Sequence, residues 1–312
     1  MVGRMMKLIF AGTPSTALPV LERLDELHEV AAVLTRPPAA QGRSSKLVGS
    51  PVEMWARSHG IEVLAPRSLK DPSLTARIRE IAPQCCPVVA YGGLITRELL
   101  NIPIHGWINL HYSLLPAYRG AAPVQRALMD GCDSTGVTVF RIVPALDAGP
   151  VYLQTRVPIE DEETTGDVLR RLSLVGADAM AEGLARAEQG QEPVPQSEQG
   201  VSLAPKVTPD EAHLDLTCDG RRCVNLVRAM SPEPGAWAEM GSGRFKILRA
   251  RIADLPSGMG ETLPGTLHAT KKSLLCRVGD GWIECVEVQA PGKKPMPGAD
   301  WARGGLRGQC LR

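Results

Sequence analysis

The residues best suited to chemistry lie in one short run, 108–113 (INLHYS). Alternate residues of a β-strand point to the same side, so Asn109 and His111 are predicted to project together. An amide beside an imidazole that titrates near neutral pH can donate hydrogen bonds to an oxyanion and move a proton. Asp147 stands in a later loop of small residues, 146–150 (LDAGP), where its carboxylate would raise the pKa of the imidazole.

The same residue types also occur as a buried, hydrogen-bonded polar pair and as a turn-forming aspartate. The spacing of Asn109, His111 and Asp147 alone does not distinguish these interpretations from a catalytic site. The elements predicted around them indicate where the three side chains lie.

The first half of the chain alternates short apolar runs with helical stretches, a pattern typical of a mostly parallel α/β sheet. Asn109 and His111 then lie near the carboxyl end of a buried strand, where open α/β sheets bind ligands. No GxGxxG or GxxxxGK[ST] motif follows the first strand, so the phosphate cradle of a dinucleotide or nucleoside triphosphate is missing from the sequence. The expected strands are 7–12, 29–35, 61–64, 85–91, 107–113, 137–143 and 151–157, and the expected helices are 14–27, 50–60, 71–81, 121–129 and 164–188.

Beyond these elements the pattern changes. Residues 189–206 are rich in Pro, Gln and Ser without periodicity, which predicts an interdomain linker. The short runs 244–250, 265–268, 273–278 and 282–288, separated by Gly and Pro, then predict a small barrel or sandwich. The expected organisation is therefore a catalytic domain at 1–188, a linker at 189–206 and a second domain at 207–312.

The overall charge excludes a uniformly basic coat for nucleic acid, because 35 Lys and Arg residues are matched by 34 Asp and Glu residues. The charges are unevenly divided, since residues 206–312 carry 16 basic and 12 acidic side chains. This local excess fits either ordinary scatter or a C-terminal module that faces a polyanion.

The cysteines and the apolar runs bear on the compartment. The chain has eight cysteines without a CxxC pair, no secretory leader, and no apolar run near the roughly 20 residues of a membrane span. These features predict a cytoplasmic protein with reduced thiols and no membrane association. Cys218 and Cys223 with His213 match no common zinc spacing, so no metal is expected.

Longer motifs resemble a known family. Residues 109–128 (NLHYSLLPAYRGAAPVQRAL) and 135–152 (TGVTVFRIVPALDAGPVY) resemble the catalytic signature of the folate-dependent formyltransferases. Five further motifs are similar to the branch of that family that acts on methionyl-tRNA, and together they span nearly the whole chain. They are FAGTP at 10–14, the basic loop ending in SPV at 50–52, VVAYGGLI at 88–95, APKVTPDEAHLD at 204–215 and QAPGKKPM at 289–296.

The resemblance implies a Rossmann-like, mostly parallel sheet domain followed by a C-terminal OB-type β-barrel domain that binds tRNA. The implied reaction transfers the formyl group of 10-formyltetrahydrofolate to the α-amino group of initiator methionyl-tRNA, without a metal. Asn109, His111 and Asp147 match the catalytic set of the family. In this scheme Asn109 and a protonated His111 donate hydrogen bonds to the tetrahedral oxyanion, and Asp147 stabilises the imidazolium.

The resemblance also implies binding residues. A run that contacts folate in the family corresponds to Ser113, Leu114, Leu115 and Pro116, and the pterin is expected in a cleft shaped by Val89, Ala90, Tyr91, Gly92 and the Asp147 loop. The basic loop 36–49 is expected to read the acceptor stem of the tRNA through Arg36, Arg43 and Lys46, with Arg43 on the key arginine of the family.

We expect the protein to be a monomer. Three other functions share part of this evidence. A related formyltransferase acting on a nucleotide-sugar or another small amine would keep the three catalytic residues and would not need the loop around Arg43. A formyltetrahydrofolate hydrolase would not need the basic C-terminal domain. A catalytically idle tRNA-binding module would not need Asn109, His111 and Asp147.

Overall fold

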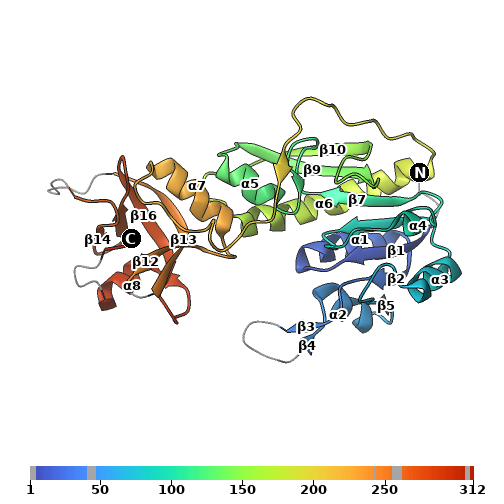
Figure 1. The fold of residues 1–312 in the computed structure, drawn as a ribbon, viewed down its shortest axis with the longest axis horizontal. Helices are drawn as coiled ribbons and strands as arrows, with labels where there is room; N and C mark the ends of the chain where they lie inside the picture. The colour runs from blue at the N-terminus through green and yellow to red at the C-terminus, as the bar shows by residue number, and fades with distance from the viewer. Residues whose placement is uncertain (1–4, 41–46, 242, 255–261, 306–309) are drawn as a thin grey trace. The chain divides into compact units, whose positions relative to one another are not determined.

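A computed structural model of the chain describes residues 5–40, 47–241, 243–254, 262–305 and 310–312 (Figure 1). The chain divides into two compact units that do not follow each other simply along the sequence. The first unit comprises Met1–Ala121, Thr135–Val157 and Leu169–Ala204. The second comprises Ala122–Ser134, Pro158–Val168 and Pro205–Arg312.

The first unit is built on a seven-stranded sheet in the order β10-β9-β7-β6-β1-β2-β5. The five strands from β7 to β5 are parallel, and β9 is antiparallel to β7. The mostly parallel α/β sheet predicted from the alternating pattern is therefore confirmed. The strands are β1 (Lys7–Gly12), β2 (Glu29–Leu34), β5 (Glu62–Leu64), β6 (Cys86–Val89), β7 (Trp107–His111), β9 (Ser134–Arg141) and β10 (Val151–Pro158).

Local sequence explains where the helices between these strands begin. Ser50 Oγ accepts a hydrogen bond from the Glu53 amide at 3.0 Å, and Asp71 Oδ1 accepts one from the Ser73 amide at 2.9 Å. Each contact satisfies a backbone donor that has no partner inside the helix, and each helix starts on a proline. The helical segments are η1 (Ser15–Ala17), α1 (Leu18–Leu27), α2 (Pro51–Ser58), α3 (Pro72–Ile81), α4 (Arg97–Leu100) and α6 (Thr165–Glu188).

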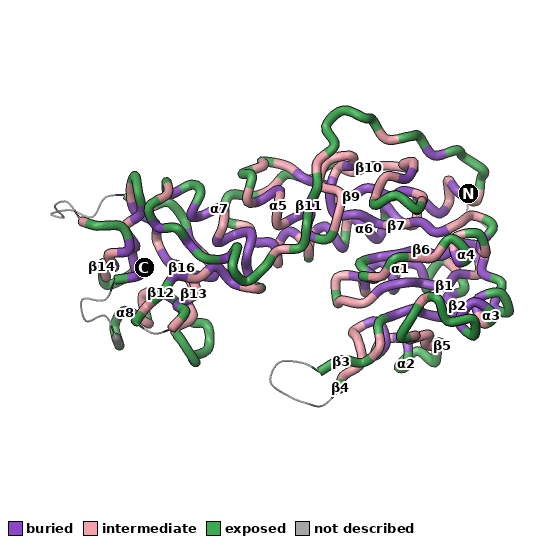
Figure 2. The backbone as a smooth tube through the Cα atoms, in the orientation of Figure 1, coloured by how far each residue is buried: buried purple, intermediate pink, exposed green. Residues whose placement is uncertain are grey.

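Close packing of α6 fixes the strand that carries Asn109 and His111. A Cβ atom on Gly176 of α6 would meet Leu110 Cδ2 of β7 within 2.4 Å, and one on Gly183 would come equally close to Val139 Cγ1 of β9. The two glycines therefore let α6 approach the sheet more closely than any other residue would allow. Buried residues follow most of the central strands of the sheet, as the tube shows (Figure 2). Leu110 is turned toward α6 and is almost fully buried. Asn109 and His111 consequently lie on the opposite face of β7.

The second unit confirms the predicted β-rich C-terminal region. Its six-stranded sheet has the order β12-β13-β16-β15-β14, with β17 also paired to β16, and the neighbouring strands are antiparallel. The apolar sides of these strands and of α7 pack into one core. The strands are β12 (Ala236–Met240), β13 (Gly243–Ala253), β14 (Leu267–Ala269), β15 (Leu274–Arg277), β16 (Trp282–Gln289) and β17 (Met296–Pro297), and the helices are α5 (Pro123–Met129), α7 (Gly220–Met230) and α8 (Gly298–Gly305).

Helix α7 was not expected from the sequence, although two local signals mark it. Asp219 Oδ1 accepts a hydrogen bond from the Arg222 amide at 2.9 Å and caps the helix. Cys223, Val227 and Met230 are buried at helical spacing. The short β-like runs that follow along the chain led us to expect only strands in this region, so the helix was not predicted.

The end of the expected linker is held against the first unit. Val194 forms a bridge with Val151, and β11 (Leu203–Ala204) pairs in parallel with β8 (Arg119–Gly120). In Figure 1 this segment is the yellow loop that passes over β10, and Figure 2 labels β11 near its end. Within the described ranges, no helix is both long and apolar enough to cross a membrane.

The contact between Gly176 and Leu110 predicts an effect on stability. We expect Gly176→Val to lower the free energy of unfolding by about 1–3 kcal/mol, because the new side chain forces α6 away from β7. The exposed Asp178→Val change on the same helix introduces the same β-branched side chain and should cost less. Urea unfolding of both variants measures the difference, and a loss in Gly176→Val no larger than that in Asp178→Val would show that the contact with Leu110 does not set the cost.

Candidate active site

His111 is the last residue of β7, and Asn109 lies two residues earlier on the same strand face. In the register of the sheet His111 lies opposite Thr138 of β9, and Asn109 lies between Val88 of β6 and Phe140 of β9. The Phe140 ring meets the imidazole edge-on, with 6.5 Å between ring centroids. Among the residues that the structure describes, the half-buried Asn109 amide has no hydrogen-bond partner, so its N–H groups are available to a ligand.

Both nitrogens of the His111 ring face a fixed oxygen. Nε2 lies 2.8 Å from the carbonyl oxygen of Tyr118, and Nδ1 lies 3.8 Å from Asp147 Oδ2. A carbonyl oxygen only accepts hydrogen bonds, so the first contact requires a proton on Nε2. In the neutral ring the basic lone pair is then on Nδ1, facing the carboxylate across a gap longer than a hydrogen bond.

Burial disfavours the protonated ring that is expected from the sequence. Burial lowers the pKa of His111 below its ordinary value, and the Asp147 carboxylate and the Tyr118 carbonyl offset this only in part. The expected direction of the Asp147 contribution is correct, but the cost of burying a charged ring is larger. The direction of this shift favours the neutral ring over the imidazolium.

The Asp147 loop is pinned on several sides. Asp147 Oδ2 accepts a hydrogen bond from the Gly120 amide at 2.8 Å. Asp147 itself has a φ of 45°, in the left-handed region that residues with a Cβ rarely adopt. A Cβ on Gly149 would lie 1.7 Å from the Arg141 carbonyl, so only glycine lets the loop turn back against β9. The carboxylate is mostly buried, with 16% of its side chain exposed.

The run that the resemblance assigns to folate is held by residues that sequence reasoning missed. Thr138 Oγ1 donates to the Ser113 carbonyl at 2.6 Å and accepts from the Leu115 amide at 3.1 Å. Gln154 Nε2 donates to the Leu115 carbonyl at 2.7 Å and to Thr138 Oγ1 at 3.0 Å. Thr138 reaches this run because its strand, β9, pairs with β7. No sequence pattern indicated that pairing.

Within that run the side chains differ in what they offer a ligand. Ser113 is buried and its hydroxyl donates to the Ala117 carbonyl at 2.6 Å, so its side chain serves the turn. Leu115 is buried, whereas Leu114 and Pro116 are half-buried.

The second predicted folate segment alternates in burial. Val89 and Tyr91 are buried, and Ala90 and Gly92 are exposed with positive φ angles of 47° and 76°. The Tyr91 ring packs in the apolar core, and its carbonyl accepts from Thr13 Oγ1 at 3.0 Å. The carboxyl ends of β1, β6 and β7 are thus neighbours, and what they present at Ala90 and Gly92 is mainly backbone.

The residues expected to contact tRNA are only partly described. Arg36 is exposed just after β2, whereas Arg43 and Lys46 lie outside the described residues. The described ends of their loop form a short hairpin of β3 (Ala39–Ala40) and β4 (Leu47–Val48). In the second unit, exposed basic side chains include Arg221, Arg222, Lys271, Lys272, Lys293 and Lys294.

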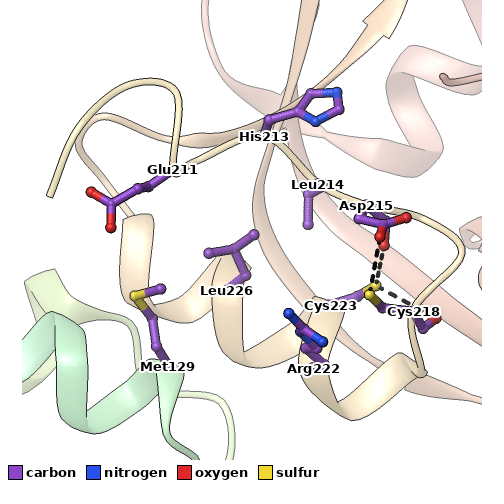
Figure 3. A pocket seen from close by; sticks show the side chains of 9 residues that line it. All are labelled: Met129, Glu211, His213, Leu214, Asp215, Cys218, Arg222, Cys223 and Leu226. Carbon is purple, nitrogen blue, oxygen red and sulfur yellow. Dashed lines mark hydrogen bonds between the residues drawn. The ribbon is translucent and has the colours of Figure 1, made fainter.

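A separate hollow of about 200 Å³ lies in the second unit and includes none of the predicted catalytic residues (Figure 3). Cys218 Sγ donates to Asp215 Oδ2 at 3.4 Å, and burial together with that carboxylate raises the pKa of the Cys218 thiol. The residues that line this hollow are Met129, Glu211, His213, Leu214, Asp215, Cys218, Arg222, Cys223 and Leu226. Nowhere in the described part of the chain do three or more His, Cys, Asp or Glu side chains form a group that could hold a metal ion.

Comparison with known proteins agrees with both units. Residues 6–187 match the family described as formyl transferase, and residues 206–306 match the formyl transferase C-terminal domain. The chain is 48% identical over 308 residues to a methionyl-tRNA formyltransferase of Saccharopolyspora erythraea, covering 96% of this chain and 97% of the relative. It is equally similar, at 48% over 311 residues, to one of Thermobifida fusca, covering 98% and 99%.

Among solved structures, HypX from Aquifex aeolicus in complex with tetrahydrofolic acid shares the fold, with a TM-score of 0.67. That likeness has 19% identity and covers 96% of this chain and 47% of HypX. Two matched domains in the same order, and near-complete coverage of relatives at close to half identity, lead to one conclusion: the chain belongs to the formyl transferase family.

Proposed function

We propose that this protein transfers the formyl group of 10-formyltetrahydrofolate to the α-amino group of methionyl-tRNA, with Asn109, His111 and Asp147 as its catalytic residues. The observation that supports the chemistry is the geometry of His111, whose Nε2 is bound to the Tyr118 carbonyl and whose Nδ1 faces the Asp147 carboxylate. Beside it lies the Asn109 amide, which has no hydrogen-bond partner among the described residues. The full-length similarity to methionyl-tRNA formyltransferases supports the choice of substrates.

In this mechanism the amine attacks the formyl carbon and the carbonyl oxygen becomes an oxyanion. The Asn109 amide donates a hydrogen bond to that oxyanion, an interaction that typically contributes about 3 kcal/mol in such sites. His111 Nδ1 takes the proton that the attacking nitrogen loses. The proton then passes to N10 of tetrahydrofolate as the bond between carbon and N10 breaks, so the tetrahydrofolate leaves neutral.

Asp147 acts on the imidazolium that exists between these two proton transfers. A carboxylate oxygen 3.8 Å from Nδ1 favours the charged ring electrostatically, and the Tyr118 carbonyl holds the other N–H. Burial keeps the resting ring neutral, so the base is ready near neutral pH.

Folate is proposed to lie along the exposed backbone at Ala90 and Gly92 and the half-buried Leu114 and Pro116. These positions border the carboxyl ends of β6 and β7, where open α/β sheets bind their ligands.

The tRNA is proposed to bind through its acceptor stem to the loop that carries Arg36, Arg43 and Lys46, and through its backbone to the basic C-terminal unit. Phosphate contacts of this kind make binding depend on salt. We further propose a cytoplasmic monomer. Among the described residues no disulfide joins any of the cysteines, which fits a reducing compartment.

The oxyanion role predicts a large loss on truncation of the amide. We expect Asn109→Ala to lower kcat at least ~100-fold because the oxyanion loses a hydrogen-bond donor. Steady-state kinetics with methionyl-tRNA measure the effect, and circular dichroism checks the fold. The exposed Asn101→Ala is the matched control, and turnover of Asn109→Ala like that of the control would refute the assignment.

The Asp147 role predicts a shift in pH dependence. Activity requires neutral His111 and is lost as pH falls through the His111 pKa, which the carboxylate raises. Asp147→Asn removes that contribution, so the acidic limb of the kcat/KM profile should move to lower pH while the plateau falls. Asp178→Asn, on the exposed face of α6, should leave the profile unchanged. An unshifted limb in Asp147→Asn would make the residue structural.

Substrate identity is tested by competition between amines. We expect fast transfer to methionyl-tRNA and slow transfer to free methionine, glycinamide ribonucleotide or an amino-sugar nucleotide, because the tRNA body supplies binding energy that positions the amine. Arg43→Ala should weaken transfer to methionyl-tRNA and leave folate binding intact, whereas the exposed Arg67→Ala should change neither. Efficient formylation of a small amine, with Arg43→Ala harmless, would favour a small-molecule formyltransferase.

A further inference from the structure

Residues 194–204, here called the strap, return along the first unit after α6 and contact both loops that surround His111. The Tyr118 amide donates to Ser202 Oγ at 2.8 Å, and the Arg119 amide donates to the Ser202 carbonyl at 2.9 Å. A Cβ on Gly120 would lie 2.6 Å from the Ala204 carbonyl, so the strap and the loop 118–120 are in direct backbone contact.

Gln196 is the strap residue that joins this loop to the Asp147 loop. Its Oε1 accepts two hydrogen bonds from the Arg119 guanidinium, from Nε at 3.1 Å and from Nη2 at 2.6 Å. Its Nε2 donates to the carbonyls of Asp147 and Gly149, both at 2.8 Å. All four hydrogen bonds that a side-chain amide commonly makes are therefore used, and each half of the amide serves a different loop.

The two joined loops supply both oxygens that face His111. Tyr118 provides the carbonyl on Nε2, and Asp147 provides the carboxylate near Nδ1. Both residues have left-handed backbone angles, with φ of 61° at Tyr118 and 45° at Asp147. Residues with a Cβ keep such angles only where the surrounding contacts over-determine them. The bonds from Gln196 and Ser202 are contacts of this kind.

We propose that Gln196 is a positioning residue of the formyl transfer site, which holds the Asp147 carboxylate at its distance from His111 by tying the Asp147 loop to the loop 118–120. The proposal rests on the catalytic roles proposed for His111 and Asp147. Gln196 touches neither the imidazole nor the reacting atoms, so it acts only through the two loops.

The groups around His111 define what a displaced loop would change. Asp147 is the charged group that faces the ring, the Tyr118 carbonyl faces Nε2, and the Phe140 ring meets it edge-on. The Arg119 guanidinium, the other charge on these loops, is bound to Gln196. If the Asp147 loop moves away, burial acts on the imidazole with less opposition and its pKa falls.

The experiment compares Gln196→Ala and Gln196→Glu with Gln199→Ala, which removes an exposed amide from the same strap. Gln196→Glu keeps an acceptor for Arg119 but loses the donor to the Asp147 loop. The His111 titration is followed by NMR, with His111→Asn to assign the signal, and kcat and KM are measured with methionyl-tRNA across pH.

We expect both Gln196 variants to lower kcat about 10- to 100-fold, as small misplacements of catalytic groups do, with KM for methionyl-tRNA within about twofold. The His111 titration and the acidic limb of kcat/KM should move to lower pH, in the direction of Asp147→Asn. Adding Gln196→Ala to Asp147→Asn should shift the titration no further, because the carboxylate through which Gln196 acts is gone.

A lowered melting temperature with an unchanged His111 titration in both Gln196 variants would overturn the proposal and leave Gln196 a structural residue. So would behaviour like that of Gln199→Ala. The catalytic roles proposed for His111 and Asp147 have their own test, and they fail if Asp147→Asn leaves formyl transfer intact. The two failures can be distinguished, because the NMR titration of His111 reports on the position of the Asp147 loop without requiring turnover.

Discussion

The enclosure of one imidazole at the end of a parallel strand governs the site. His111 is buried to 6% exposure, and each of its ring nitrogens faces an oxygen from a different loop. Burial opposes the charged ring, whereas the Asp147 carboxylate and the Tyr118 carbonyl favour it. The net balance between burial and these two oxygens favours the neutral ring. If the ring takes up a proton, the Asp147 carboxylate is already in place as its counter-charge. A small displacement of either loop changes that balance.

The rest of the first unit serves to fix this arrangement. Gly176 lets α6 press on Leu110, which anchors the back of β7 while Asn109 and His111 face the other way. Thr138, one strand away, ties down the turn that follows His111. The parallel order of β7, β6 and β1 brings their carboxyl ends together, so exposed backbone at Ala90 and Gly92 borders β7. The strands thus position Asn109 and His111, and the loops supply the oxygens that face the imidazole.

The segment between α6 and the second unit does more than connect domains. Its composition, without periodicity, is what an unstructured linker would have, yet Gln196 and Ser202 use their polar groups to bind the loops around His111. A Pro- and Gln-rich stretch has few side chains to bury, so it docks through hydrogen bonds and a short strand pairing instead of an apolar face. The chain reaches Pro205, where the second unit resumes, directly after these contacts.

The sequence by itself determined the α/β sheet, the strand that carries Asn109 and His111, and the helices that begin at Ser50 and Asp71, because strand alternation and helix start signals act over a few residues. It also carried the family, through motifs spread along the whole chain. Helix α7 was not predicted, because its N-terminal cap and its helical spacing of apolar residues lie between short runs that resemble β-strands. Only the tertiary structure decided how deeply His111 is buried and which two loops Gln196 joins. Both depend on packing between residues far apart in the chain, such as Gln196 and Asp147, whose free energies no local pattern encodes.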